Sequence, residues 1–301
     1  MPATQLDGAI ALITGAGSGI NFAFARILHG RGCNVLIADL RLRPENEALI
    51  DTLNHQAGPN GPRILFQETD VTNWKHLDRA FDRVEQEFGT TADLVCAGAG
   101  IYEPPAAGFW ADRDPDSHYK ILDVNLLHPM KMTRIAVRRM QRAGKKGHIL
   151  HIASVAAQTA SLVTPLYQAS KHGVVSFVRG MTGLQDLCGI RVVCICPGSV
   201  ATPLLMEEPQ VQTWFNQAKD VLLNPADLAN AMLAVTENSN GRYPAGTILE
   251  VTDPDEQLWR HVPLYNNPGP QGRAISVSNK DNGLKQIAQL LAEDSGRDSR
   301  I

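Results

Sequence analysis

The sequence has no long hydrophobic run and no excess of positive charge. Its longest apolar stretches, residues 8–13 and 192–196, are far shorter than the ~20 residues that a membrane-spanning helix needs. No basic segment followed by an apolar run opens the chain, so we expect no secretory signal. Lysine and arginine number 28 against 31 acidic residues, a net charge of −3. With no basic stripe, we expect a soluble protein that binds neither nucleic acid nor membrane.

The chain has few cysteines, and their number is odd, which argues against a framework of disulfides. No CxxC or HExxH pattern occurs among the cysteines and the nine histidines, so we expect no metal site. Three of the cysteines lie in strand-like apolar runs, which favours buried free thiols in a reducing compartment and hence a cytoplasmic location. The five cysteines are Cys33, Cys96, Cys188, Cys194 and Cys196.

Short apolar runs alternate with helical stretches along most of the 301 residues. This alternation predicts a single-domain, Rossmann-type α/β fold, a doubly wound parallel sheet of about seven strands flanked by helices. No internal repeat or linker divides the chain, so we predict one NAD-binding domain over 1–260. Residues 261–301 are expected to form a C-terminal extension, with a helix near 283–292 and a frayed end. The predicted strands are 9–14, 34–38, 63–68, 94–97, 148–153, 192–195 and 247–251.

Glycines between the first predicted strand and the first helix point to a phosphate-binding loop. Gly15, Gly17, Ser18 and Gly19 precede a helical stretch that begins at Ile20. Such glycines let the backbone approach a pyrophosphate, and the helix N-terminus offers free N–H groups. Surface turns can also be rich in glycine, but the strand before and the helix after favour a dinucleotide site.

The second predicted strand ends in an acid that suits the ribose of NAD. Asp39 lies 20 residues after Gly19, close to the spacing expected for a carboxylate that binds the 2′-hydroxyl. The alternative is that Asp39 merely opens the next turn. Arg41 and Arg43 follow and could meet a 2′-phosphate, but Asp39 would repel that phosphate. NAD is therefore favoured over NADP.

Tyr167 and Lys171 stand four residues apart, on one face of a predicted helix. Because a phenol titrates near ~10, a cation beside it is needed to stabilise the phenolate and make proton transfer feasible. A half-buried tyrosine beside a solvated lysine has the same spacing, so the pair alone is a weak signal. Ser154 just past a strand, and Asn125 inside a helix predicted over 118–142 and interrupted by Pro129, add polar groups nearby.

Taken together, these motifs resemble the short-chain dehydrogenases/reductases. The resemblance covers residues 6–251, and the separation of 13 residues between Ser154 and Tyr167 agrees with it. The motifs that carry it are, in order, TGAGSGI at 14–20, Asp70-Val71, Asn125, Ser154, Tyr167 with Lys171, and PGSVAT at 197–202.

The resemblance implies a role for each matching residue. Tyr167 would be the acid/base, Lys171 would lower its pKa and bind the nicotinamide ribose, and Ser154 would hold the substrate oxygen. Asn125 would hold a water that links Lys171 to solvent. The residues expected to touch the dinucleotide are Gly15, Gly17, Ser18, Gly19, Ile20, Asp39, Asp70, Val71, Gly98, Gly100, Tyr167, Lys171, Pro197, Val200 and Thr202.

Two positions depart from the family pattern. Asn21 stands where a third glycine is usual, which puts the loop geometry and the cofactor affinity in question. The usual Asn-Asn-Ala-Gly turn after the fourth strand reads Ala-Gly-Ala-Gly at 97–100, without the asparagine that normally bonds within the sheet. Neither change removes a predicted catalytic group.

The substrate is expected to be a hydrophobic alcohol or ketone. Residues 102–117 read as an insertion near the pocket and 204–223 as a mobile helical lid. The insertion and the tail resemble those of fungal secondary-metabolism dehydrogenases and of the hydroxyprostaglandin dehydrogenase branch. A homodimer or homotetramer is expected from the resemblance. The presumed pocket residues are Ile101, Tyr102, Phe109, Trp110, Val155, Leu162, Leu204, Leu205, Met206 and Trp214, some of which would only pack the lid.

The prediction is thus an NAD-dependent oxidoreductase that interconverts a secondary alcohol and a ketone. One alternative is a dinucleotide-binding sensor or scaffold without catalysis, which Asn21 favours and the full set of polar site residues disfavours. Another is a dehydratase or isomerase on the same fold, which would cause no net change in the nicotinamide.

Overall fold

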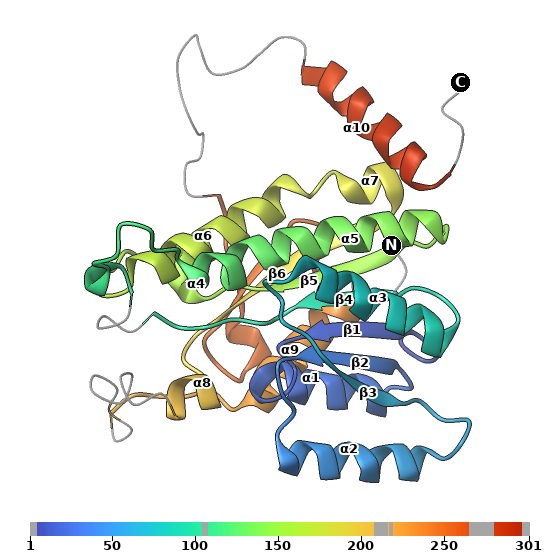
Figure 1. Ribbon diagram of the computed structural model, residues 1–301, viewed down its shortest axis with the longest axis horizontal. Helices are drawn as coiled ribbons and strands as arrows, with labels where there is room; N and C mark the ends of the chain where they lie inside the picture. Colours follow the sequence, from blue (N-terminus) through green and yellow to red (C-terminus); the bar gives the residue numbers. More distant parts are fainter. Residues whose placement is uncertain (1–4, 104–107, 208–215, 217–218, 265–279, 297–301) are drawn as a thin grey trace.

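In a computed structural model of the chain, eight strands form one sheet between two layers of helices (Figure 1). The structure describes residues 5–103, 108–207, 216, 219–264 and 280–296. The order across the sheet is β3-β2-β1-β4-β5-β6-β7-β8, the doubly wound Rossmann-type arrangement. The strands are β1 (Ile10–Thr14), β2 (Asn34–Asp39), β3 (Ile64–Glu68), β4 (Leu94–Ala97), β5 (Gly147–Ile152), β6 (Ile190–Pro197), β7 (Ile248–Val251) and β8 (Arg260–His261).

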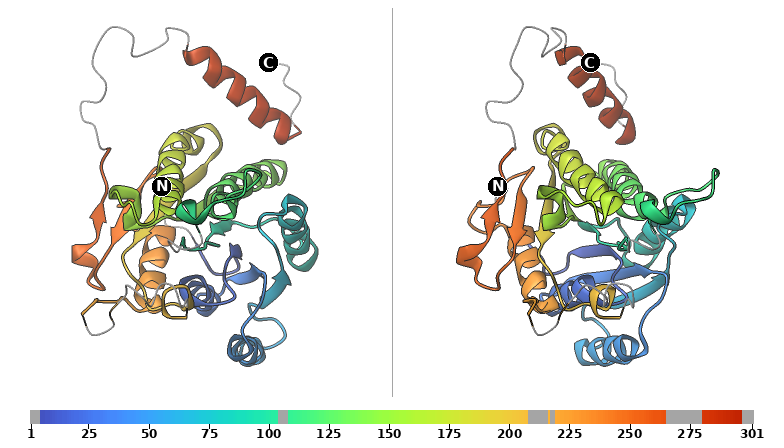
Figure 2. Two further views of the ribbon diagram at one scale, coloured as in Figure 1. Left: turned by 60° about the vertical axis from the view of Figure 1, so that its left-hand side comes forward. Right: turned by 90° about the vertical axis from the view of Figure 1, so that its left-hand side faces the viewer.

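Helices cover both faces of the sheet, as Figures 1 and 2 show. On one face lie α1 (Gly19–Gly30), α2 (Pro44–Ala57) and α9 (Pro225–Glu237). The other face carries α3 (Trp74–Phe88), α5 (His128–Arg142) and α6 (Pro165–Gly180). Shorter helices connect these elements: η1 (Phe109–Ala111), α4 (Lys120–Leu122), η2 (Asp123–Leu127), η3 (Val155–Gln158), α7 (Leu184–Cys188), α8 (Pro203–Met206) and η5 (Glu256–Leu258).

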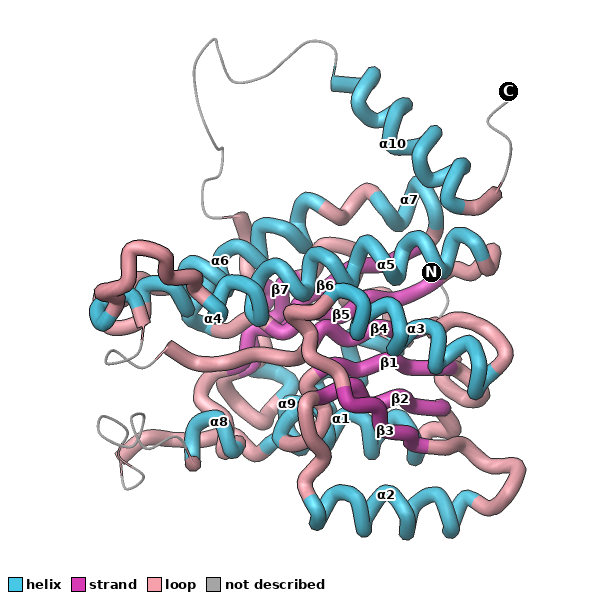
Figure 3. Tube along the Cα trace, viewed as in Figure 1, coloured by secondary structure: helices cyan, strands magenta, loops and turns pink. Residues whose placement is uncertain are grey.

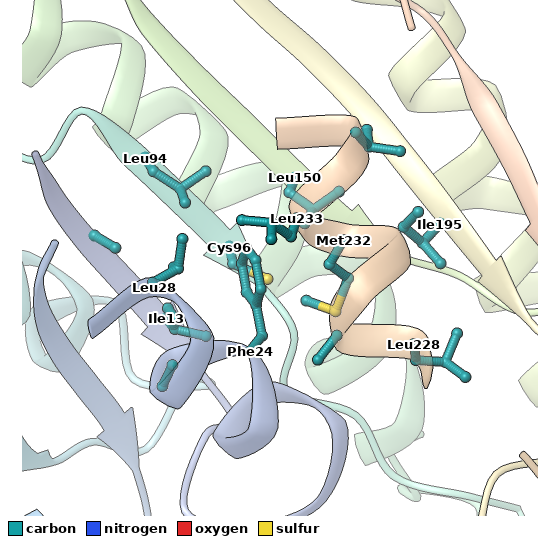
Figure 4. Packing of buried hydrophobic residues seen from close by; sticks show 14 of the residues in the cluster. Ile13, Phe24, Leu28, Leu94, Cys96, Leu150, Ile195, Leu228, Met232 and Leu233 are labelled. Atoms are coloured by element: carbon teal, nitrogen blue, oxygen red, sulfur yellow. The ribbon is translucent and has the colours of Figure 1, made fainter. Parts of the chain in front are cut away.

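The central strands are apolar throughout because both of their faces are covered. Every residue of β1, β4 and β6 is buried, as expected for parallel strands between helical layers. Figure 4 shows the core on one face, where α1 packs against α9 and where Phe24 and Leu28 of α1 belong to one cluster with Leu228 and Met232 of α9. All four of these side chains are fully buried, so this contact fixes both helices on the sheet.

The strand order creates the crevice in which a ligand can bind. From β1 the chain moves outward through β2 and β3, then returns to place β4 on the other side of β1. The connections that follow β1 and β4 therefore diverge at the carboxyl ends of these two neighbouring strands. In open α/β sheets, ligands bind in the crevice at such a switch point.

The last strand differs from the parallel sheet of about seven strands that the sequence predicts. β8 pairs with β7 in the antiparallel sense, through Leu249 opposite His261 and Glu250 opposite Arg260. Only eight residues, 252–259, separate the two strands. A parallel crossover needs about a dozen residues or more, so the chain returns in the opposite direction.

The helix predicted over 118–142 is divided into three pieces. A π-helical turn, η2, separates the single turn α4 from α5, and Asn125 lies within it. Pro129 occupies the first turn of α5. Proline has no N–H for the carbonyl four residues earlier, which is that of Asn125, so the α-helical pattern cannot run through this point.

The C-terminal helix α10 (Lys280–Asp294) is longer than the predicted segment near 283–292. It packs on α5 near its own C-terminal end, where Leu291 is buried and Asp294 accepts two hydrogen bonds from Arg134. Residues 281–290 of the helix are exposed (Figure 2). The predicted frayed end reaches 301, and residues 297–301 lie outside the described part of the chain.

Two buried histidines lie between the sheet and α5. The Nδ1–H of His128 donates to the Val124 carbonyl at 3.1 Å, so its Nε2 accepts from the Thr14 hydroxyl at 3.1 Å. His151 shares a 3.0 Å hydrogen bond with Thr133, whose own hydroxyl donates to the Pro129 carbonyl. Burial lowers the pKa of His128 to about 4 and that of His151 to about 3.

These pKa values predict that acid destabilises the fold. Histidines of the unfolded chain take up protons near pH ~6.5, whereas His128 and His151 resist protonation until about pH 4 and about pH 3. The unfolded state then binds more protons, so the free energy of unfolding should fall as the pH drops from ~6.5 towards ~4. His128 alone should account for a loss on the order of 3 kcal/mol.

Urea unfolding at several pH values measures this slope. His151→Gln should flatten it, whereas His55→Gln, at an exposed position of α2, serves as the control. An unchanged slope in His151→Gln would show that this histidine is not held neutral by the fold.

Candidate active site

A crevice of about 770 Å³ opens at the carboxyl ends of the parallel strands. This size is within the range of ligand-binding clefts, roughly 300–1,000 Å³. Loops and short helices form this edge of the molecule, as the pink segments of Figure 3 show. All of the residues predicted to touch a dinucleotide line the crevice, as does Ser154; Asn125 lies behind its wall. The structure therefore brings the predicted dinucleotide residues together at one edge of the sheet.

The loop after β1 lies tightly against the turn after β4. Gly15 has a φ of +68°, and a Cβ there would lie 2.4 Å from the Cα of Ala99. The backbone conformation and the contact both require glycine. Gly17 donates its N–H to the Asp39 carboxylate at 2.8 Å, and its carbonyl accepts from Asn46 of α2 at 2.8 Å. Asn46, which the sequence analysis missed, thus fixes the loop from the opposite side.

The two departures from the family pattern turn out to be in contact with each other. The Asn21 amide donates to the Gly15 carbonyl at 3.2 Å and to the Gly98 carbonyl at 2.9 Å. A Cβ at Gly98 would lie 2.4 Å from the Asn21 amide nitrogen. An asparagine in the first turn of α1 therefore fills the space that the missing side chain at 98 leaves free. The hydrogen bonds of Asn21 thus support the turn at 97–100, which lacks an asparagine of its own.

Tyr167 lies in the first turn of α6, where its phenol faces Ser154. The two side chains are joined by a hydrogen bond, and the Ser154 hydroxyl oxygen also accepts from the Ala156 N–H at 3.1 Å. The Tyr102 ring packs against the Tyr167 ring, with 4.8 Å between centroids. Tyr167 and Ser154, 13 residues apart in sequence, thus meet as the spacing predicts.

Lys171 lies one helical turn beyond Tyr167 and is 5% exposed. Its Nζ donates to the Ile152 carbonyl at 2.9 Å and lies 5.6 Å from the centroid of the Tyr167 ring. Burial lowers the pKa of the Lys171 ammonium to about 8. The pKa of Lys171 therefore lies close to neutral pH, so this side chain can both accept and release a proton there.

The pKa of Tyr167 departs from the expected direction. Residue 167 is partly exposed as a whole, yet burial of its phenol raises the pKa to about 12, and the hydrogen bond from Ser154 opposes this shift only in part. Lys171 is not among the groups that shift this pKa, so the lowering expected from it is not found. A further positive charge is needed before Tyr167 gives up its proton near neutral pH.

Asn125 holds the segment after β4 in place. Its amide oxygen accepts from the Ile101 N–H and its amide nitrogen donates to the Ile101 carbonyl, both at 2.9 Å. A Cβ at Gly100 would lie 3.5 Å from Asn125 and 3.7 Å from the Lys171 ammonium. Asn125, in the π-helical turn η2, and Lys171 therefore both face Gly100.

A buried acid that the sequence analysis did not single out touches the backbone of Tyr167. One oxygen of Glu103 accepts from the Tyr167 N–H at 2.8 Å, and the other accepts from the Phe109 N–H at 3.1 Å. Glu103 is 3% exposed. Both oxygens thus accept from backbone N–H groups, and one of them caps an N–H at the N-terminal end of α6. Nothing in the local sequence marks this contact, which spans 64 residues.

The substrate end of the crevice is apolar in part. Of the predicted pocket residues, those on its wall are Ile101, Tyr102, Val155, Leu204 and Leu205. Trp110 is exposed and donates its indole N–H to the Leu162 carbonyl at 2.7 Å, so these two residues form a bridge outside the wall. Residues 208–215, 217 and 218 of the predicted lid, with Trp214, lie outside the described chain, as do 104–107 of the predicted insertion.

The five cysteines are free, and four of them are fully buried, as predicted. Cys188 is half-buried. In the part of the chain that the structure describes, no helix is long and apolar enough to cross a bilayer. Within the same residues, no cluster of histidine, cysteine, aspartate or glutamate has the arrangement of a metal site.

A family model described as short chain dehydrogenase matches residues 9–213. The chain belongs to the short-chain dehydrogenase family. It is therefore an oxidoreductase of the class that uses NAD or NADP, as the loop at 14–20 and the tyrosine–lysine pair indicated.

Several curated relatives are similar to this short-chain dehydrogenase over most of their length. Momilactone A synthase of Oryza sativa subsp. japonica is 30% identical and covers 83% of this chain and 90% of its own. Borneol dehydrogenase, mitochondrial, of Lavandula x intermedia is 30% identical, with 82% and 90% covered. 15-Hydroxyprostaglandin dehydrogenase [NAD(+)] of Mus musculus is 28% identical, with 82% and 91% covered.

The fold of this short-chain dehydrogenase is also similar to a solved structure. The 3-ketoacyl-(acyl-carrier-protein) reductase from Brucella melitensis, complexed with NADH, superposes with a TM-score of 0.65 at 27% identity. The similarity covers 82% of this chain and 98% of that one.

The Asn21–Gly98 contact predicts a coupled pair of substitutions. Asn21→Gly removes two hydrogen bonds of a buried amide and should lower the free energy of unfolding by about 1–3 kcal/mol. It should weaken NADH binding rather than tighten it, because the loop at Gly15 loses support. Gly98→Asn should also destabilise, since its Cβ would collide with Asn21.

The double variant Asn21→Gly/Gly98→Asn should recover much of the lost stability, because the asparagine then occupies the space left at 21. Thermal unfolding of the four proteins gives the coupling energy. Gly30→Asn, which places the same side chain in open space, is the control. Purely additive losses would show that the two positions act independently.

Proposed function

We propose that the protein is an NAD-dependent oxidoreductase that interconverts a secondary alcohol and a ketone on a hydrophobic small molecule. The observation that carries this proposal is the contact of the Tyr167 phenol with Ser154, one turn from Lys171, in the same crevice as the glycine loop. A proton-transfer group, an oxygen-binding group and a dinucleotide site thus share one cavity.

The crevice has the residues that a dinucleotide needs, with the loop at 15–19 for the pyrophosphate and Asp39 for the adenosine ribose. At the opposite end, 197–202 would hold the nicotinamide beside Tyr167. Thr202 approaches the glycine loop closely, since a Cβ at Gly19 would lie 3.2 Å from its methyl group. A nicotinamide held by these residues would supply the hydride chemistry, as acceptor in alcohol oxidation and as donor in ketone reduction.

The protein's own groups would move the proton. Ser154 holds the substrate oxygen next to Tyr167, whose phenolate removes the hydroxyl proton as the alcohol is oxidised. In the reverse direction the neutral phenol donates its proton to the developing alkoxide. Because burial raises the pKa of Tyr167 to about 12, the phenolate depends on positive charge nearby. The Lys171 ammonium supplies part of that charge, and its own pKa of about 8 allows it to pass the proton on.

The preference for NAD over NADP rests on Asp39. Its carboxylate is held at the end of β2 by the Gly17 N–H, where a 2′-phosphate would meet a negative charge. Two comparisons agree with this choice: the mouse relative is named for NAD(+), and the Brucella reductase was crystallised with NADH.

A hydrophobic substrate fits the apolar residues on the wall, among them Ile101, Val155 and Leu204. Relatives named for borneol and for hydroxyprostaglandin point the same way. The catalytically silent sensor and the dehydratase or isomerase stay as alternatives that the experiments below separate. The cytoplasmic location, the homo-oligomeric state and the division into 1–260 and 261–301 stay predictions.

Removing the phenol hydroxyl tests the assignment of the acid/base. Tyr167→Phe should lower kcat by about 10²–10⁴-fold, the usual contribution of a general acid or base, while NADH binding is largely kept. Turnover of a panel of hydrophobic alcohols and ketones, followed at the nicotinamide absorbance, measures this. Tyr243→Phe, a buried tyrosine outside the crevice, is the matched control. Retained activity in Tyr167→Phe would remove this residue from the mechanism, and product without nicotinamide oxidation or reduction would favour the dehydratase or isomerase.

Substitution of Asp39 tests the cofactor assignment. Asp39→Ala removes the charge that repels a 2′-phosphate, so the ratio of NADPH to NADH affinity should rise by about tenfold, equal to ~1.4 kcal/mol. Asp39→Asn, which keeps an oxygen for the Gly17 N–H, separates the charge from loop support. Nicotinamide fluorescence titrations give both affinities, with Asp51→Asn on the exposed face of α2 as the control. An unchanged ratio in both variants would refute the ribose role of Asp39.

A further inference from the structure

An ion pair joins the two sides of the crevice at its adenosine end. Arg43 comes just before α2 and Glu207 just after α8, 164 residues apart. One guanidinium nitrogen of Arg43 donates to a Glu207 oxygen at 2.9 Å, and a second nitrogen donates to the other oxygen. Both side chains line the crevice. We call this two-point contact the Arg43–Glu207 clasp.

The clasp closes a ring of contacts around the phosphate loop. On one side, Asn46 of α2 holds the Gly17 carbonyl, and Arg43 precedes the same helix. On the other side, Thr202 approaches Gly19, and α8 leads from Thr202 to Glu207. Within the described residues, these contacts link the loop, α2, the clasp and α8 in a ring at one end of the crevice.

The clasp also decides which charges a ribose phosphate would meet. Six charged side chains line the crevice away from Lys171: Asp39, Arg41, Arg43, Asp70, Lys120 and Glu207. Their formal charges cancel. A guanidinium binds a phosphate best through two parallel N–H donors, and Glu207 engages two nitrogens of Arg43. Arg43 is therefore occupied by a carboxylate from the opposite wall, although its place after β2 would suit a 2′-phosphate.

We propose that Glu207 is a specificity-determining residue, which excludes NADP by occupying Arg43 and delays the exit of the bound dinucleotide by closing the clasp. This inference rests on the proposed function, because it needs a dinucleotide in the crevice. Asp39 acts by direct repulsion, whereas Glu207 acts through Arg43 from a segment that the family's cofactor motif does not include.

The exposure of the pair fits a contact that opens and closes. The Arg43 and Glu207 side chains are 27% and 56% exposed. Exposed ion pairs are weak and are screened by salt. The Arg43 hydrogen bond holds the pKa of the Glu207 carboxyl below its usual range, so the pair is charged on both sides at neutral pH. The clasp can therefore select between cofactors by a modest factor without trapping either.

Glu207→Gln tests the proposal, since it removes the charge with little change of shape. Among the described residues, Arg43 would then keep only its longer ion pair with Glu45, at 3.7 Å. NADPH affinity should rise about three- to tenfold, the effect of an exposed two-point ion pair, while NADH affinity changes less. Dissociation of NADH, followed by stopped-flow displacement, should become faster in the variant. Salt should accelerate dissociation from the native protein more than from Glu207→Gln.

Two further variants separate the clasp from a general charge effect. Arg43→Gln/Glu207→Gln has no arginine to release, so it should show no gain in NADPH affinity. Glu47→Gln removes the same charge from the exposed face of α2 and should leave the preference unchanged. An unchanged NADPH affinity in Glu207→Gln, or an equal gain in the double variant, would overturn the role of Glu207. If the native protein binds neither NADH nor NADPH, both the proposed function and this inference are wrong. If the native protein binds NADH but Glu207→Gln does not change the NADPH affinity, only this inference is wrong.

Discussion

The close approach of the β1 and β4 turns governs the geometry of the whole site. The Thr14 hydroxyl accepts the Gly98 N–H at 3.0 Å and donates to His128 at 3.1 Å, which joins β1, β4 and the helical layer at one atom. Asn21 adds a second bridge between the same two turns. Because the connections that follow the two strands diverge beyond this point, the contact between the two turns sets the floor of the crevice and the position of the phosphate loop above it.

Burial then decides the electrostatics of that crevice. It raises the pKa of Tyr167 to about 12 and lowers that of Lys171 to about 8, so both groups favour their neutral forms more than they would in water. In such a buried site an added charge strongly stabilises a group of opposite charge. The low dielectric that disfavours ionisation also strengthens the attraction between opposite charges. The side chains of Tyr167 and Lys171 are thus in position, and a positive charge placed beside Tyr167 would favour its phenolate.

The sequence predicts the parts of this site that depend on local pattern. The loop at 15–19, Asp39, and the Tyr167–Lys171 pair follow from spacing within one strand–turn–helix unit or one helix, and all line the crevice. The contacts that it does not predict join distant segments. Asn21 meets Gly98 across 77 residues, Glu103 meets Tyr167 across 64, and Arg43 meets Glu207 across 164. No periodicity records such pairs, since only tertiary packing brings them together.

The antiparallel strand β8 forms one edge of the sheet and limits strand pairing there. An exposed edge strand offers a row of N–H and C=O groups with which another chain can pair, and long, flat edges promote aggregation. β8 has only two residues, both exposed, and its Arg260 is bound to Glu250 of the neighbouring strand. Because this edge strand is so short and is charged, it offers very few backbone N–H and C=O groups with which a strand of another chain could pair. The eight-stranded sheet is thus closed on this side to growth by strand addition.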